Sequence, residues 1–196
     1  NGSRITKREK HNFTAKDRND NGLIDRIEWI TPHLSNQTFE VVIEITDARH
    51  LNENRAFISN IYNETKKKDG FWSEEIPDKH YVRVNFEQNL SSDRDITLYP
   101  RVISGSPSIE VYEENENETV AKFTDINSNE YNKEYLNDLS GKQDTFDLRI
   151  LNGSIEVDHI VDPTSQITIE RIYPTTDINV TRNEFFNVTL NVTCLN

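Results

Sequence analysis

Residues 144–161 read DTFDLRILNGSIEVDHIV and carry the strongest secondary-structure signal in the chain. Apolar and polar side chains alternate over residues 146–150 and again over 155–157, and Asn152-Gly153 separates the two runs. Alternation with a period of two is typical of strands that bury one face, and Asn-Gly between such runs is a strong hairpin signal. The stretch therefore predicts an antiparallel β-hairpin.

The same alternation recurs along the chain between further turn signals. These signals are Gly105-Ser106-Pro107, the acidic run 114–118 and Leu139-Ser140-Gly141. The predicted strands span residues 39–45, 82–87, 95–103, 108–113, 119–126, 144–151, 154–161, 166–173 and 184–195. Many short strands at this spacing predict a mainly β protein with an antiparallel β-sandwich.

One segment has a helical period instead. The apolar residues of the segment 51–62 fall on one helical face, Lys66-Lys67-Lys68 would lie in the last turn, and Gly70 would follow as a stop. Cations stabilise the last turn of a helix, and Gly is favoured just after it. We expect one amphipathic helix over residues 52–68, about four turns long, packed on the sandwich.

Composition and charge exclude several classes of protein. The chain has 196 residues and a net charge of −12, from 34 acidic and 22 basic side chains. No stretch approaches the roughly 18 apolar residues of a membrane span. The acidity argues against a nucleic-acid partner, because phosphate binding requires clustered Lys and Arg. The absence of Met indicates a mature or excised piece, with any signal peptide or anchor outside it.

Asparagine gives the clearest indication of location. The chain has 23 Asn residues, and ten of them begin an Asn-x-Ser/Thr sequon, where composition alone predicts roughly 3.5. The excess predicts a secreted or cell-surface glycoprotein, although Asn-rich turns by themselves also create sequons. The ten positions are Asn1, Asn12, Asn36, Asn63, Asn89, Asn117, Asn152, Asn179, Asn187 and Asn191.

Charge and pattern suggest three parts. Residues 1–16 form a basic arm that either frays in solvent or docks on an acidic neighbour. Residues 17–162 are expected to hold a calcium loop and the sandwich, with a strand ending at Pro163. Residues 163–196 offer only two strands, too few to bury a core, so we expect an incomplete immunoglobulin-like domain or strands completed by a neighbour. The single Cys194 would pair outside residues 1–196 or with another molecule.

The motif with the most specific chemistry is the twelve-residue stretch 17–28, DRNDNGLIDRIE. It fits a calcium loop, with side-chain oxygens at positions one, three and five, a glycine at six, a backbone carbonyl at seven and a bidentate carboxylate at twelve. Pro32 stops any exiting helix, so we expect a structural clamp and not a switch. A solvated acidic turn is the alternative. The predicted Ca²⁺ ligands are Asp17, Asn19, Asn21, Leu23, Asp25 and Glu28.

The sequence contains no evident catalytic arrangement. Its five His residues lack metal-ligand spacing, and it has neither a nucleophile elbow nor a phosphate loop. The carboxylate pairs Asp93/Asp95 and Asp144/Asp147 are expected to be solvated. Trp29, Trp72 and the seven Tyr residues could form a sugar-binding platform, although aromatics more often belong to a core. We therefore expect a protein that is not an enzyme.

Several stretches resemble a module of large archaeal secreted and cell-surface proteins. They read NGLIDRIEWITPHLSNQTFE (21–40), YVRVNFE (81–87), DITLY (95–99), DTFDLR (144–149) and VDHIVDP (157–163). The calcium loop is similar to those of dockerins, and FFNVTLNVTC (185–194) resembles the start of an immunoglobulin-like domain. The resemblance implies a β-sandwich joined to lectin-like or immunoglobulin-like domains, and it implies no catalytic residues.

These features lead to one hypothesis and two alternatives. The hypothesis is an extracellular structural glycoprotein, a subunit of an archaeal cell-surface filament or S-layer-like coat that calcium makes rigid. Its expected partners are copies of itself or other surface proteins, reached by β-augmentation or docking of the arm. The alternatives are an adhesive or carbohydrate-binding ectodomain that contacts cell-surface glycans, and a noncatalytic module of a secreted hydrolase.

Overall fold

The computed structural model describes the backbone of residues 12–16, 18, 26–29, 39–173 and 189–195, and the side chains of residues 42–163 together with a few near the N-terminus. Its contacts divide the chain into two units, residues 1–37 and 38–196, and each is described by itself. In the first unit β1 (Phe13–Lys16) pairs antiparallel with β2 (Arg26–Trp29).

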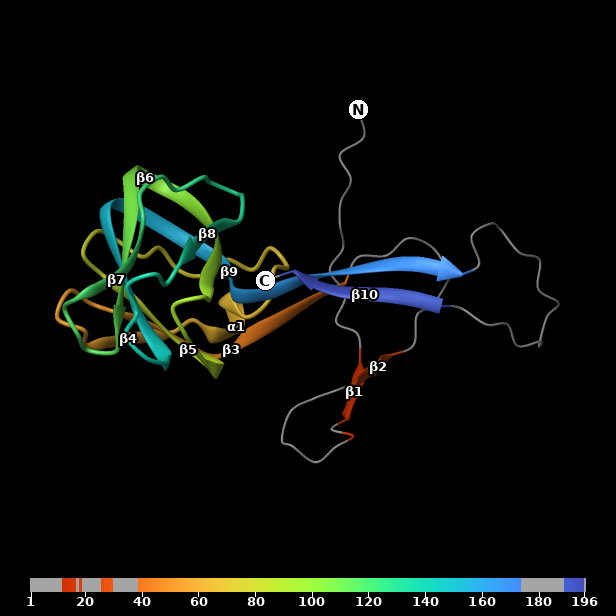
Figure 1. Ribbon diagram of the computed structural model, residues 1–196. Coiled ribbons are helices and arrows are strands. Elements are labelled where there is room, and N and C mark those ends of the chain that lie inside the picture. The colour runs from red at the N-terminus through yellow and green to blue at the C-terminus, as the bar shows by residue number, and fades with distance from the viewer. Residues whose placement is uncertain (1–11, 17, 19–25, 30–38, 174–188, 196) are drawn as a thin grey trace. The chain divides into compact units, whose positions relative to one another are not determined.

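The second unit is built on an antiparallel sheet of eight strands in the order β4-β3-β5-β9-β6-β7, with β8 paired to β6 and β10 paired to β9 (Figure 1). The described residues include one short helix, α1 (Tyr62–Thr65). The prediction of a mainly β, antiparallel, sandwich-like fold is confirmed. The strands are β3 (Phe39–Leu51), β4 (Phe57–Asn60), β5 (Tyr81–Leu90), β6 (Asp95–Glu113), β7 (Thr119–Phe123), β8 (Asn132–Tyr135), β9 (Gln143–Tyr173) and β10 (Thr189–Leu195).

Strand β9 is 31 residues long, and it pairs with β5, β6 and β3 along different parts of its length. Its first part pairs with β5, where Arg149 lies opposite Tyr81, and its last part pairs with β3, where Asp162 lies opposite Ile43. Because β3 and β5 also pair with each other, the three strands close around a core. Alternate side chains point into that core, as the period of two predicts. The buried side chains include Phe86, Phe146, Leu148, Ile150, Ile155 and Ile160.

Two of the predicted turns lie inside long strands. Gly105-Ser106-Pro107 lies within β6 and Asn152-Gly153 lies within β9, so the predicted hairpin at residues 152–153 is wrong. Gly105 and Asn152 have positive φ values of 71° and 64°, as their turn chemistry predicts. Both strands shift register at this point, and the pair bends together as a bulge. The local conformation matches the residue types, but the chain does not reverse.

The predicted helix over residues 52–68 is wrong in all but one turn. The side-chain oxygen of Asn52 accepts hydrogen bonds from the backbone N–H groups of Asn54 and Ala56, each at 2.9 Å. Such side-chain bonds to nearby backbone compete with helix formation. The chain therefore turns and returns along β3 as β4, and only Tyr62–Thr65 is helical.

Strand β9 continues through Pro163, where the sequence predicts the end of a strand. Pro163 lies opposite Val42 of β3, and the register of this strand pair shifts just beyond it. Proline is tolerated in a sheet at a bulge of this kind. The division of the chain at residues 16 and 162 stays a prediction. Among the described residues, helices fall short of the length and apolar character needed to cross a membrane.

Candidate functional site

Four half-buried rings of the second unit contact one another in succession, and we call Trp72, Tyr99, Tyr131 and His159 the aromatic row. Ring centroids are 5.8 Å apart between Trp72 and Tyr99, 5.1 Å between Tyr99 and Tyr131, and 5.9 Å between Tyr131 and His159. The Tyr131 hydroxyl lies 3.0 Å from Nδ1 of His159. Aromatic contacts of this kind contribute about 0.5–1.5 kcal/mol each beyond burial. These contacts therefore stabilise the arrangement of the four rings.

The sheet register and one loop position the row. Tyr99 of β6 lies opposite His159 of β9. The buried carboxylate of Asp158 accepts a hydrogen bond from the backbone N–H of Gly70 at 3.1 Å, which holds the loop that carries Trp72. Burial raises the pKa of the Asp158 carboxyl, although the backbone hydrogen bonds favour its charged form. One segment of β9 thus fixes both ends of the row.

Two cationic side chains lie against ring faces of the row. The Lys68 ammonium lies 3.8 Å from the ring centroid of Tyr99. The Arg101 guanidinium carbon lies 4.5 Å from the ring centroid of Trp72, and Arg101 is also ion-paired with Glu156. The ring quadrupole attracts a cation to its face. The surface thus combines apolar rings with positive charge, a combination that can bind a saccharide carrying hydroxyl or acidic groups.

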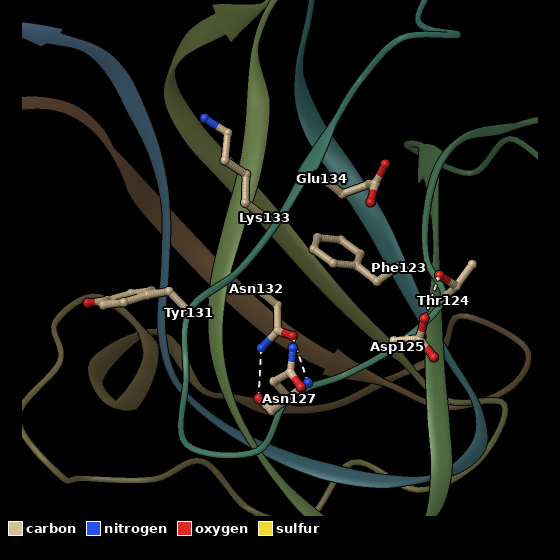
Figure 2. Close-up of a pocket in the computed structure, with 8 residues that line it drawn as sticks. All are labelled: Phe123, Thr124, Asp125, Asn127, Tyr131, Asn132, Lys133 and Glu134. Atoms are coloured by element: carbon tan, nitrogen blue, oxygen red, sulfur yellow. Dashed lines mark hydrogen bonds between the residues drawn. The ribbon is translucent and has the colours of Figure 1, made fainter.

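A polar pocket lies beside the row and shares Tyr131 with it. Figure 2 shows the Tyr131 ring directed away from the other labelled side chains. The Asn132 amide oxygen accepts a hydrogen bond from the Asn127 N–H at 2.7 Å, and its Nδ2 donates to the carbonyls of Asn127 and Glu130. Both amide hydrogens therefore close the loop before β8. The pocket is lined by Phe123, Thr124, Asp125, Asn127, Tyr131, Asn132, Lys133 and Glu134.

Two histidines 30 residues apart in the sequence meet in the structure. Nε2 of His50 lies 2.8 Å from Nδ1 of His80, and Nδ1 of His50 lies 2.7 Å from a carboxylate oxygen of Glu74. The Ser59 hydroxyl donates to that same oxygen, an arrangement unlike a nucleophile bonded to its imidazole base. Hydrogen bonds from Ser59 and His50 lower the pKa of Glu74, and burial lowers the pKa of His80. Within the described residues, no three His, Cys, Asp or Glu side chains are grouped to hold a metal ion.

The prediction of a solvated face at Asp144 and Asp147 is wrong for Asp147. Its side chain is fully buried and accepts hydrogen bonds from the Arg83 guanidinium at 2.6 and 2.9 Å. Arg55 forms a second ion pair with Asp147 at 2.9 Å. A buried carboxylate needs such partners because water cannot solvate it. Asp95 is also buried, against the same prediction, so both are structural charges.

The predicted calcium ligands lie almost entirely outside the described residues. Asp17, Asn19, Asn21, Leu23 and Asp25 are all outside them, and Glu28 is described only through the backbone of β2. The calcium site therefore stays a prediction.

The predicted glycosylation sites are described in part. The exposed sequon asparagines are Asn12, Asn63, Asn89, Asn117 and Asn152, which are all those with described side chains. The side chains outside the described residues are Asn1, Asn36, Asn179, Asn187 and Asn191. An attached oligosaccharide requires an exposed position, so the first five permit glycosylation, which stays a prediction.

Comparisons with known proteins find no relative. No family model, curated protein or solved structure matches the chain. The fold and surface described above therefore define its class, a mainly β, antiparallel, sandwich-like protein. The resemblance to archaeal cell-surface modules stays a prediction.

The sequence offers Trp72 and the Tyr residues as a possible platform and leaves His159 out. It does not group the members of the row, because Tyr99, Tyr131 and His159 lie in separate segments with no shared spacing. The one usable signal is Tyr99, which falls out of phase with the buried Ile96 and Leu98 pattern of its strand. The His50 and His80 pair gives no signal in the sequence, because only the register of β3 with β5 brings these residues together.

Proposed function

We propose that the protein is an extracellular structural glycoprotein, a non-enzymatic subunit of an archaeal cell-surface assembly such as a filament or an S-layer-like coat. The edge strand β4 gives the main support. In β4, Phe57 is 63% exposed and Ile58 is 43% exposed. One side of β4 pairs with β3, and no strand of the described residues pairs with the other side. An apolar edge of this kind can accept a strand from a neighbouring subunit.

Strand β4 is held in position by its own side chains. The Ser59 hydroxyl bonds to Glu74, and Nδ2 of Asn60 donates a hydrogen bond to Asp47 at 3.1 Å. Ser59 also lies opposite His50 in the β3–β4 register. Because the edge is already ordered, binding of a partner strand involves only a small free-energy cost of ordering it. The strand it accepts would come from a copy of this chain or from another surface protein.

The predicted sites have a consistent place in this assembly. Oligosaccharides at the exposed sequon positions would keep the surface around each of them solvated. Calcium bound by residues 17–28 would stabilise the segment that follows the basic arm 1–16. The positive arm would attract an acidic neighbour, because the remainder of the chain carries a net negative charge.

Sedimentation of the assembled glycoprotein tests the role of the β4 edge. We expect the double variant Phe57→Lys, Ile58→Lys to sediment as single subunits, because two charges on the edge oppose strand addition. The matched control is Ile103→Lys, since Ile103 is also 43% exposed but lies on β6. It should assemble like the wild type. Assembly of the double variant to the same size as the wild type would contradict the proposal.

The aromatic row favours a second candidate, an adhesive or carbohydrate-binding ectodomain. A row of half-buried rings with adjacent cations is a reasonable saccharide surface. Glycan-array binding that disappears in Trp72→Ala and survives calcium chelation would support this candidate. Equal binding by Trp72→Ala and the wild type would remove it. A noncatalytic module of a secreted hydrolase is the third candidate, and the full-length gene would test it.

A further inference from the structure

Two of the predicted glycosylation sequons contain a hydroxyl that the folded protein hides. Asn63 lies in α1, and its sequon ends at Thr65, which is fully buried and donates a hydrogen bond from Oγ1 to the carbonyl of Ile61 at 2.8 Å. Asn152 lies in β9, and its sequon ends at Ser154, which is 3% exposed. In both sequons the asparagine is exposed while the hydroxyl two residues later is not.

The Ser154 hydroxyl is enclosed by the bend of the β6–β9 pair. Its Oγ lies 2.8 Å from Oγ of Ser104 on the facing strand. The intervening Gly153 packs so closely on β6 that a Cβ there would lie 2.3 Å from the carbonyl oxygen of Ser104. The backbone N–H of Asn152 is bound as well, to the carboxylate of Asp78 at 2.7 Å. The Asn152 sequon cannot be lifted from the sheet without opening this bend.

Other described sequons are more open. In the sequon of Asn12, both the asparagine and Thr14 are exposed. In the sequon of Asn117, the asparagine lies in the loop between β6 and β7, and Thr119 is half-buried. These sites offer internal comparisons within the same molecule.

The hydroxyl matters because the acceptor sequence requires Ser or Thr two residues after the asparagine. That requirement means that the transferase contacts the hydroxyl when it binds the acceptor. A buried, hydrogen-bonded hydroxyl becomes available only when its segment opens. In a packed strand or helix turn, opening requires a free energy that can approach that of global unfolding.

We propose that Asn63 and Asn152 are glycosylated only before the second unit folds, whereas Asn12 accepts an oligosaccharide from the folded protein. This inference rests on the proposed glycoprotein function. It divides the sequons into an early and a late class, and it requires that the transferase meet the chain while it is still extended. Because both asparagine side chains are exposed after folding, the glycans added early project into solvent and do not obstruct the fold.

The experiment uses the full chain produced without glycans, a purified oligosaccharyltransferase and its oligosaccharide donor. Two samples are modified in parallel, one of folded chain and one of chain kept unfolded until it is added to the transferase. Peptide mass spectrometry then gives the occupancy of each site over time. We expect Asn12 to be glycosylated at a similar rate in both samples. Asn63 and Asn152 should be glycosylated at least tenfold more slowly in the folded sample, which is about the effect of a 1.4 kcal/mol opening free energy.

A second variant tests the contact with Ser104 separately from the burial of Ser154. In Ser104→Ala the hydroxyl of Ser154 loses its partner on the facing strand but remains buried, so Asn152 should still be modified at least tenfold more slowly in the folded sample than in the unfolded one. Modification of folded wild type at Asn63 and Asn152 as fast as at Asn12 would overturn the inference. Failure to modify any site in the unfolded chain, with no glycan on the native protein, would overturn the glycoprotein proposal and this inference with it.

Discussion

Gly105 of β6 and Gly153 of β9 lie opposite each other where the two strands bend. A Cβ atom on Gly105 would lie 2.3 Å from the carbonyl oxygen of Asn152, and one on Gly153 would lie 2.3 Å from that of Ser104. Only glycine allows two backbones to approach this closely. The bend lets β6 and β9 stay paired from Thr97 opposite Val161 to Glu113 opposite Phe146.

Replacing Gly105 tests the importance of this close approach. We expect Gly105→Ala to lower the free energy of unfolding by about 2–4 kcal/mol, from a positive φ and from overlap with the facing backbone. Gly141→Ala is the matched control, because Gly141 also has a positive φ but no atom within 4 Å of an added Cβ. It should lose only about 1 kcal/mol. Equal losses in urea unfolding would show that the backbone approach is unimportant.

The buried ion pair of Asp147 with Arg83 and Arg55 gives a second prediction. Asp147→Asn leaves two guanidinium groups without a buried counter-charge, and we expect a loss of about 3–5 kcal/mol. Arg49→Ala is the control, because its ion pair with Asp47 is half-exposed and should contribute at most about 1 kcal/mol. Urea unfolding of both variants measures the difference. A loss below about 1 kcal/mol for Asp147→Asn would contradict the role of this pair.

Asp162 predicts a pH dependence of stability. Its side chain is buried, and burial raises its pKa from 3.8 to about 6 against the opposing effect of Arg94. The folded protein therefore keeps a proton that the unfolded chain releases between about pH 4 and 6. The stability from this group is fully present below about pH 4 and is lost as the pH rises through 6.

The measurement for Asp162 is the free energy of unfolding of the wild type minus that of Asp162→Asn at several pH values. We expect this difference to fall by about 2–3 kcal/mol from pH 4 to 7. Carboxyls whose pKa is lowered on folding, such as Glu74 and Glu110, act in the opposite sense, and the subtraction removes them. A difference that is flat or rises with pH would contradict the raised pKa of Asp162.

The strand pattern could be predicted from the sequence, and the direction of the chain could not. The alternation around Phe146 and Ile155 places these side chains in the core as expected. Asn152-Gly153 favours a positive φ, and a positive φ occurs in a bulge within a strand as well as in a hairpin turn. The helix expected over residues 52–68 fails for a related reason, since the Asn52 side chain caps a turn there.

Sites assembled from distant segments gave little signal in the sequence. Asp147 and Arg83 are 64 residues apart, and their ion pair exists only because β5 and β9 are in register. The aromatic row likewise depends on the pairing of Tyr99 with His159. Motifs that are contiguous, such as the calcium loop and the sequons, can be recognised in the sequence because their chemistry is local.

Calcium binding by the loop at residues 17–28 is the fourth prediction. Calorimetry should show one site, and Glu28→Gln should weaken it because the bidentate carboxylate is lost. Asp20→Asn is the control, since position four of the loop supplies no ligand and its affinity should change little. Calcium at a hundredfold excess over Kd should stabilise the loop by about 2.7 kcal/mol. Unchanged affinity in Glu28→Gln would contradict the assignment.

Electron microscopy of the native glycoprotein, before and after calcium chelation, shows whether the protein forms a surface assembly. A structural subunit should give ordered polymers, and the proposed rigid role of calcium predicts that they loosen on chelation. Polymers whose order is unchanged by chelation would support the proposed assembly and limit the role of calcium to local stabilisation. Dispersed single particles in both conditions would contradict the proposed structural role.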